Sequence, residues 1–113
     1  MRKLAELQTG GTRRAPDYDT IIALVATTKR VPRRMFINGS RCRDTTARAR
    51  QLAMYLAHVV LGRSLAEVGD AFRRDRTTVS YACARIEDMR DDPLFDAEVS
   101  RLEQVIEAQE ELA

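Results

Sequence analysis

The sequence has few of the residues that mark specialised classes of protein. Its 113 residues contain no tryptophan, three phenylalanines, three tyrosines, one histidine and two cysteines. Cys42 and Cys83 are 41 residues apart, with neither a CxxC pair nor a histidine cluster beside them. This spacing indicates neither a zinc site nor a disulfide framework, and we expect two reduced thiols in a cytoplasmic protein.

Several functional motifs are also missing. No run of 18 apolar residues is present, so no membrane span is predicted. The first residues lack the apolar core of a secretory signal. No phosphate-binding loop, GxGxxG or GxSxG motif occurs, and the single histidine, His58, has no partner cluster. We therefore expect no enzyme, no catalytic residue, no metal, no cofactor and no bound nucleotide.

Charge is present in quantity but is unevenly distributed. The formal net charge is only +2, with 32% charged and 44% hydrophobic residues. Residues 1–50 carry twelve Lys or Arg against four acids, a net of +8; residues 51–90 carry +1 and residues 91–113 carry −7. A basic first half favours a polyanionic partner, and an acidic end favours either a solvated helix or a protein partner.

The apolar spacing and the capping residues predict an all-α fold with about five helices and one short helical turn. The predicted helices run from about Tyr18 to Val31, over 46–61, from Leu65 to about Ala71, from Asp75 onward, and after Pro93, with a short turn over 32–37 and a basic loop over 38–43. Periodicity places Val59 and Val105 on core faces. The predicted organisation is a basic arm (1–16), a DNA-binding domain (17–90) and an acidic helix (91–113).

A helix-turn-helix is indicated over residues 64–90. Ser64 and Glu67 form a capping box before a short helix, and Asp75 caps a second helix with a polar, basic start. The first residues of such a second helix meet base edges in the major groove. The candidates for base readout are Arg76, Thr77, Thr78, Ser80 and Tyr81. Small hydroxyl residues are also common at any helix start, so this pattern alone leaves both interpretations open.

Residues 48–86 resemble the C-terminal DNA-binding domain (domain IV) of the bacterial replication initiator DnaA. The shared motifs are Arg48-x-Arg50-Gln51, Ala53-Met54-x-Leu56, Ser64-Leu65-x-Glu67-x-Gly69-x-Ala71-Phe72, Asp75-x-Thr77-Thr78-Val79 and Ala82-Cys83 with Ile86. The likeness extends from near Tyr18 to about Met89. Since the initiator's ATPase domain has no counterpart here, we expect a stand-alone DNA-binding module.

The resemblance assigns DNA-contacting roles to named positions. It implies base reading by Asp75, Arg76, Thr77 and Thr78, and phosphate contact by Arg85. It implies minor-groove contact by the basic loop through Arg41 and Arg43, and further DNA contact by Arg50 and Gln51, beside Arg48. Three positions depart from the family pattern: Arg76 replaces a histidine, Ala66 replaces a proline, and two glycines are missing before Arg74-Asp75. We therefore expect DNA binding with an altered target, in which Arg76 favours guanine.

The sequence thus predicts a sequence-specific, double-stranded DNA-binding transcriptional regulator, nucleoid-associated in the cytoplasm. Free-standing DnaA-like regulators include activators of phage-like gene transfer agents, and the resemblance permits that role. The alternatives are a replication-control protein at origin boxes and a protein–protein adaptor. The last helix is either a packing helix or a docking helix for a second copy or a protein such as RNA polymerase, a sigma-like factor or another regulator. Its candidate partner residues are Phe95, Val99, Leu102 and Ile106.

Overall fold

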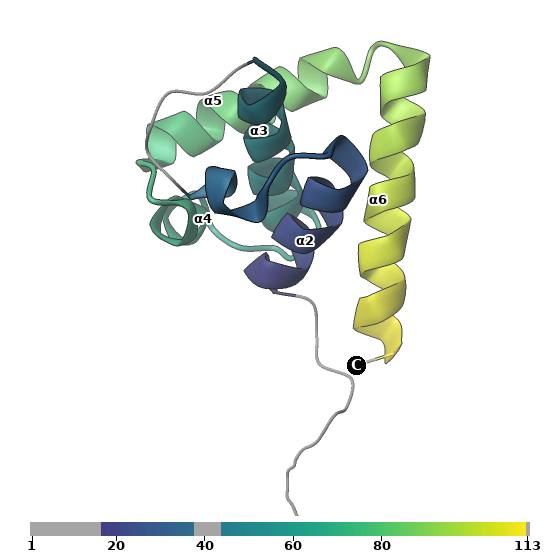
Figure 1. Cartoon of the computed structure of the whole chain (residues 1–113), viewed down its shortest axis with the longest axis horizontal. Coiled ribbons are helices and arrows are strands. Elements are labelled where there is room, and N and C mark those ends of the chain that lie inside the picture. Colours follow the sequence, from purple (N-terminus) through teal and green to yellow (C-terminus); the bar gives the residue numbers. More distant parts are fainter. Residues whose placement is uncertain (1–16, 38–43, 113) are drawn as a thin grey trace, which may run out of the picture.

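The computed structural model describes residues 17–37 and 44–112, and its regular structure in those ranges is entirely helical (Figure 1). In chain order the elements are α2 (Tyr18–Lys29), the 3-10 helix η1 (Arg33–Phe36), α3 (Asp44–Val59), α4 (Leu65–Phe72), α5 (Arg76–Met89) and α6 (Pro93–Leu112). The predicted all-α fold, with five helices and one short turn, is confirmed for these ranges. The predicted arm (1–16) and the whole predicted basic loop (38–43) lie outside them.

Helix α3 forms the centre of the fold. It packs against α2, η1, α4 and α5, and Leu52 and Leu56 are fully buried along it. The helix begins and ends two residues earlier than predicted, at Asp44 and Val59. The amides of Val60 and Leu61 both donate to Leu56 O as the helix unwinds toward Gly62, whose φ of +73° turns the chain away. Val59 is consequently 47% exposed, and its predicted core position is wrong.

Helix α2 is capped at both ends. The Asp17 carboxylate accepts a hydrogen bond from the Thr20 amide at 3.0 Å, which satisfies a backbone donor of the first turn. The helix closes at Arg30, which adopts a left-handed conformation, and the Val31 amide donates to Ala26 O. Pro32 follows directly, and proline disfavours helix at the residue before it.

Helix α6 covers one side of the core and runs along the right edge of Figure 1. Val99, Leu102 and Ile106 are buried in the same apolar cluster as the other helices. These three residues occupy the inward face, so Val105 lies beside it and is 41% exposed, which makes its predicted core position wrong. The acidic Glu98 reaches back to α2, where its Oε1 lies 2.7 Å from Lys29 Nζ.

Arg90 joins three helices at the α5–α6 connection. Its guanidinium pairs with Glu103 at 2.9 Å and with Asp96, and donates to Ser100 Oγ at 3.1 Å. It also donates to the hydroxyl of the buried Tyr55 on α3, at 3.0 Å. That hydroxyl in turn donates to Glu87 Oε2 at 2.7 Å, and burial is the main cause that raises the pKa of Tyr55 to about 12. The network fixes α6 against α3 and against the end of α5.

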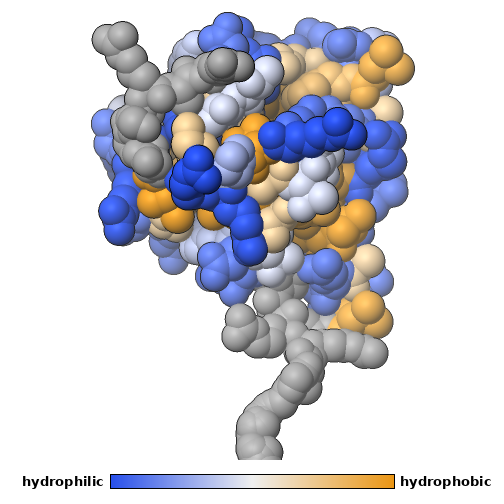
Figure 2. Space-filling model, in the orientation of Figure 1, coloured by the Kyte–Doolittle hydropathy of each residue, from blue (hydrophilic) through white to orange (hydrophobic). Residues whose placement is uncertain are grey.

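Most of the visible surface is hydrophilic, and orange apolar patches lie at the right edge where α6 runs (Figure 2). Leu94, Val105 and Leu112 are the exposed large apolar residues of α6. Within the described ranges, no helix combines the length and the apolar character needed to cross a bilayer.

Candidate nucleic-acid interface

Helix α4 is the first helix of the predicted motif, and local capping sets its start. The Ser64 hydroxyl accepts from the Glu67 amide at 3.1 Å, and the Glu67 carboxylate accepts from the Ser64 amide at 2.8 Å. The predicted capping box is therefore confirmed. Hydrogen bonding from Ser64, first of all from its backbone amide, lowers the pKa of the Glu67 carboxyl. Because the box satisfies two free amides at once, it fixes where the chain enters the short helix.

The turn between α4 and α5 is closed by backbone hydrogen bonds. The Arg73 amide donates to Asp70 O at 3.4 Å and the Arg74 amide donates to Gly69 O at 2.9 Å. This pair of bonds is a Schellman motif, with Arg73 in the left-handed conformation at φ 58°. A Cβ on Gly69 would lie 2.5 Å from Arg74 O. Glycine is thus required at position 69 because the turn itself, rather than a neighbouring helix, approaches it closely.

Asp75 positions the start of α5. One of its carboxylate oxygens accepts from the Thr78 amide at 2.9 Å and also from the Thr77 hydroxyl. These two hydrogen bonds stabilise the ionised form and lower the pKa of Asp75. The carboxylate predicted to read bases is therefore engaged as the N-cap of α5, so its role in this structure is to position the residues that follow.

The first turns of α5 expose polar side chains on one face. Val79, Ala82 and Ile86 are buried on the opposite face, against the core. The exposed set consists of the five residues predicted from the motif and the predicted phosphate contact: Arg76, Thr77, Thr78, Ser80, Tyr81 and Arg85. Tyr81 is 62% exposed, which is far more than packing requires. The structure thus brings these six side chains together on one helix.

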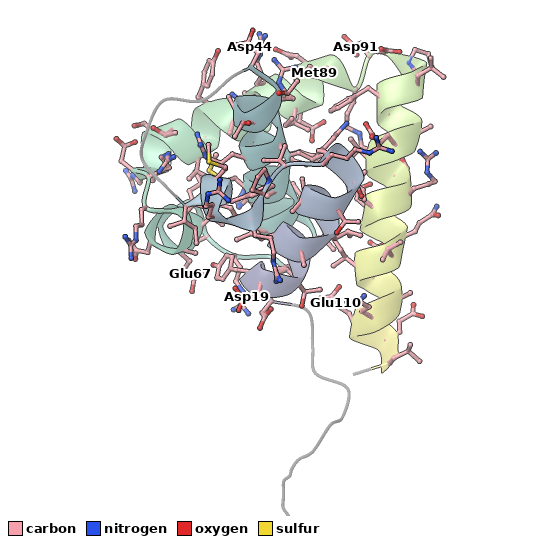
Figure 3. All side chains as sticks on the ribbon, viewed as in Figure 1. Asp19, Asp44, Glu67, Met89, Asp91 and Glu110 are labelled. Carbon is pink, nitrogen blue, oxygen red and sulfur yellow. The ribbon has the colours of Figure 1, made fainter. Side chains whose placement is uncertain are left out.

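The start of α3 differs from the prediction. Arg50 is only 9% exposed, and its guanidinium donates to Met35 O at 2.9 Å, which ties η1 to α3. The side chain lies inside the fold in this structure, and its implied contact with DNA stays a prediction. Arg48 is half-buried, donates to Gln51 Oε1 at 3.1 Å and contacts the Met89 sulphur. Figure 3 shows Met89 close to Asp44, where the start of α3 meets the end of α5.

Two other groups of predicted site residues have a different outcome. Arg41 and Arg43 of the basic loop lie outside the described residues. On α6 the candidate partner residues Val99, Leu102 and Ile106 are buried in the core, and Phe95 packs against it. Because the core of the same chain covers this face of α6, the structure supports the packing alternative for the last helix over the docking alternative.

Sequence reasoning missed two arginines in the turn. Arg74 is half-buried and its guanidinium donates to the carbonyls of Phe72 and Arg73, both at 3.1 Å, at the carboxyl end of α4. Arg73 is exposed. Two adjacent arginines before Asp75 indicate a basic turn, but the sequence does not show which of the two side chains faces solvent.

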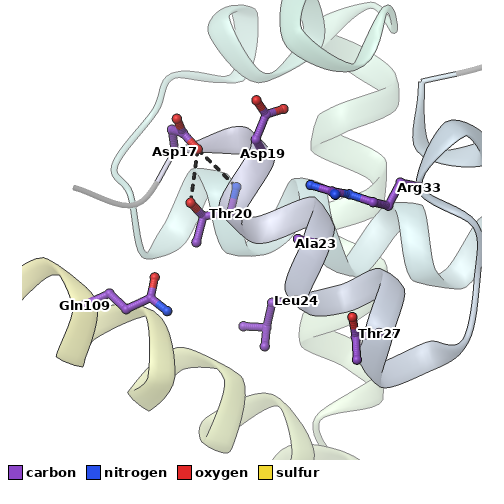
Figure 4. Close-up of a pocket in the computed structure, with 8 residues that line it drawn as sticks. All are labelled: Asp17, Asp19, Thr20, Ala23, Leu24, Thr27, Arg33 and Gln109. Atoms are coloured by element: carbon purple, nitrogen blue, oxygen red, sulfur yellow. Dashed lines mark hydrogen bonds between the residues drawn. The ribbon is translucent and has the colours of Figure 1, made fainter. Parts of the chain in front are cut away.

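A shallow groove of about 600 Å³ lies between α2, η1 and α6 (Figure 4). Its walls include Asp19, Leu24, Arg33 and Gln109, and none of its lining residues belongs to α4 or α5. The Arg33 side chain extends from η1 toward α2 in this view. The groove is therefore separate from the exposed face of α5.

Together, a capped short helix, a closed turn and a second helix with an exposed polar face define a helix-turn-helix domain. Residues 18–86 match the model of the bacterial DnaA protein helix-turn-helix family. The chain belongs to this family, and its helix-turn-helix supports binding to double-stranded DNA. The match covers α2, η1, α3, α4 and α5 as far as Ile86, and it does not include α6.

The curated relatives are replication initiators of bacteria. The chain is 39% identical over 84 residues to the chromosomal replication initiator protein DnaA 2 of Chlamydia pneumoniae, an alignment that covers 74% of this chain and 18% of the relative. It is 36% identical over 97 residues to DnaA of Acinetobacter baumannii, which covers 84% of this chain and 21% of the relative. The chain thus spans about a fifth of the length of these relatives.

Proposed function

We propose that the protein is a sequence-specific, double-stranded DNA-binding transcriptional regulator without catalytic activity. The observation that carries the proposal is the exposed face of α5, where six polar side chains follow a rigid N-cap while the opposite face is buried. A helix of this kind can enter the major groove and leave its first turns free to meet base edges.

The hydrogen bonds at the N-cap limit what each side chain can read. Thr77 donates its hydroxyl proton to Asp75, so its oxygen is left to accept from an adenine or cytosine amino group, and its methyl is free to pack on thymine. Arg76 is exposed on the same turn, and a guanidinium suits the two acceptors of guanine. We therefore expect a target with at least one guanine contacted by Arg76.

The position of α6 suits a role in transcription rather than in DNA contact. The start of α5 lies at the left of Figure 1 and α6 at the right, so the acidic helix is remote from the proposed interface. This separation keeps its carboxylates away from DNA phosphates. A protein partner such as RNA polymerase or a sigma-like factor would have to contact the outer face of α6, where Leu94 and Leu112 are exposed. Activation of phage-like or gene-transfer-agent genes is one such role.

Selection of binding sites from random double-stranded DNA tests the proposal. We expect one enriched sequence, bound at least tenfold more tightly than random DNA, with an affinity that falls steeply as salt rises. Arg76→Ala should lose about 1–3 kcal/mol at one base position and relax the preference there. Arg101→Ala is the matched control, because Arg101 is an exposed arginine of α6 and its loss should leave the preference unchanged.

The outcome that would refute the proposal is equal affinity for every sequence. If Arg76→Ala and Thr77→Ala have no effect and function is lost only when the outer face of α6 is changed, the result would instead support a protein–protein adaptor. Chromatin immunoprecipitation with sequencing would then place the bound sites in the cell, and a regulator requires that they lie at promoters.

A second candidate function is control of replication. The relatives are named as chromosomal replication initiators, and this is the observation that favours it. A protein with this role should select the initiator's own DNA box and occupy the origin. Preference for a different sequence, as we expect from Arg76, would count against it.

A further inference from the structure

Two arginines have an unusual backbone conformation. Apart from glycine, only Arg30 and Arg73 among the described residues have positive φ, at 59° and 58°. Each lies just beyond the last residue of a helix, where glycine is the residue that fits without steric cost. A residue with a side chain is strained there, so the side chain of Arg73 requires a separate explanation.

The fold does not supply that explanation for Arg73. The two hydrogen bonds that close the turn use only the backbone amides of residues 73 and 74, which glycine at position 73 would preserve. The Arg73 guanidinium is exposed and makes no hydrogen bond or ion pair with another described residue. Its neighbour Arg74 is the contrasting case, because its guanidinium donates to the carbonyls of Phe72 and Arg73.

The location of Arg73 suggests what the side chain binds. It lies two residues before Asp75, the N-cap of α5, and three before Arg76. A guanidinium at this point is at the entrance of the proposed reading helix, where the sugar–phosphate backbone borders the groove. No described acid pairs with it, so its charge is available to a phosphodiester.

We propose that Arg73 binds a DNA backbone phosphate beside the major groove that α5 enters, and that this contact is why a strained arginine occupies the turn. The inference rests on the proposed function. A phosphate contact orients the protein on the duplex and carries no sequence information. Arg73 is thus a positioning contact, whereas Arg76 reads a base.

Arg73→Gly tests the proposal with two readouts that change in opposite directions. Relief of the left-handed strain should raise Tm by roughly 2–8 °C. Loss of one phosphate contact should lower affinity by about the same factor for the selected site and for random DNA, on the order of 3–10-fold, and should reduce the salt slope by about 0.9. Arg73→Lys, which keeps the charge, should retain most of the slope.

Arg30→Gly is the matched control. Arg30 has the same conformation and is also exposed, but it lies at the end of α2 rather than beside the start of α5, and it follows Lys29, whose ammonium pairs with Glu98 of α6. Its replacement should raise Tm in the same way and leave DNA affinity and the salt slope unchanged.

The possible failures are distinguishable. If Arg73→Gly binds DNA with wild-type affinity and slope while Arg76→Ala loses specificity, the phosphate contact is refuted and the proposed function stands. A loss confined to the selected sequence would place Arg73 on a base and also refute the phosphate contact. If the wild-type chain itself shows no preference among sequences, both proposals fail.

Discussion

Replacement of Gly69 by alanine tests whether glycine is needed at this position because there is no space for a Cβ, rather than because the backbone conformation requires glycine. Gly69 lies in α4 and is buried, and the Cβ of an alanine would be 2.5 Å from Arg74 O. Ordinary carbon–oxygen contacts begin near 3.4 Å, so the turn would have to move by almost 1 Å. The obstacle is a backbone carbonyl next to the N-cap of α5, and it cannot rotate away as a flexible side chain would.

The magnitude follows from two opposing effects. Overpacking a tight site typically costs about 1–3 kcal/mol, and a backbone obstacle favours the upper half of that range. Alanine in place of glycine within a helix stabilises the helix by about 1 kcal/mol. We therefore expect Gly69→Ala to lower the free energy of unfolding by about 1–2 kcal/mol, which corresponds to a fall in Tm of roughly 5–15 °C. The displaced turn should also weaken specific DNA binding at least tenfold.

Thermal unfolding followed by circular dichroism, with DNA binding measured on the folded protein, checks this prediction. Gly62→Ala is the control, because Gly62 has a φ of +73° and no atom within 4 Å of an added Cβ. That variant should lose about 1 kcal/mol through backbone strain and keep its DNA affinity. If Gly69→Ala is as stable as wild type, or more stable, the steric argument is refuted.

Two further predictions concern the core and the N-cap. Ile106→Ala should lower the free energy of unfolding, measured by chemical denaturation, by about 2–5 kcal/mol because Ile106 is fully buried. Val105→Ala, at a 41% exposed position, should lower it by less than about 1 kcal/mol. Equal losses would contradict the packing of α6. The pKa of Asp75 is lower in the folded chain than its usual 3.8, so the ionised carboxylate stabilises the fold above that pH and less as pH falls through the folded-state pKa. Wild type should thus exceed Asp75→Asn in stability at pH 7, and the difference should close below about pH 4; a difference independent of pH would refute the role of the charge.

The helices and the candidate reading helix were largely predictable because their signals are local. Ser64 and Asp75 each cap the helix that the sequence assigns to them, since a cap joins residues two or three positions apart. The exposure of Thr77 and Tyr81 follows from the same periodicity that buries Val79 and Ala82.

The errors arose where the partner is distant in the sequence. Arg50 looked like a DNA contact, but it is buried because Met35, fifteen residues earlier, supplies a carbonyl inside the fold. The sequence left open whether Val99, Leu102 and Ile106 pack or dock, and the core of the same chain covers them. A residue pattern identifies an apolar or basic face without saying what covers that face.

The sequence by itself determined the helical content, the capping residues, the uneven charge and the family. Each of these depends on composition or on contacts between near neighbours along the chain. Only the tertiary structure decided that Arg90 joins α6 to α3 through Tyr55 and that the Arg74 carbonyl leaves no space for a side chain at Gly69. It also decided that the exposed guanidinium in the turn is that of Arg73, whereas that of Arg74 is half-buried. These outcomes depend on which helices pack together, and packing is settled by burial and close contact over the whole chain.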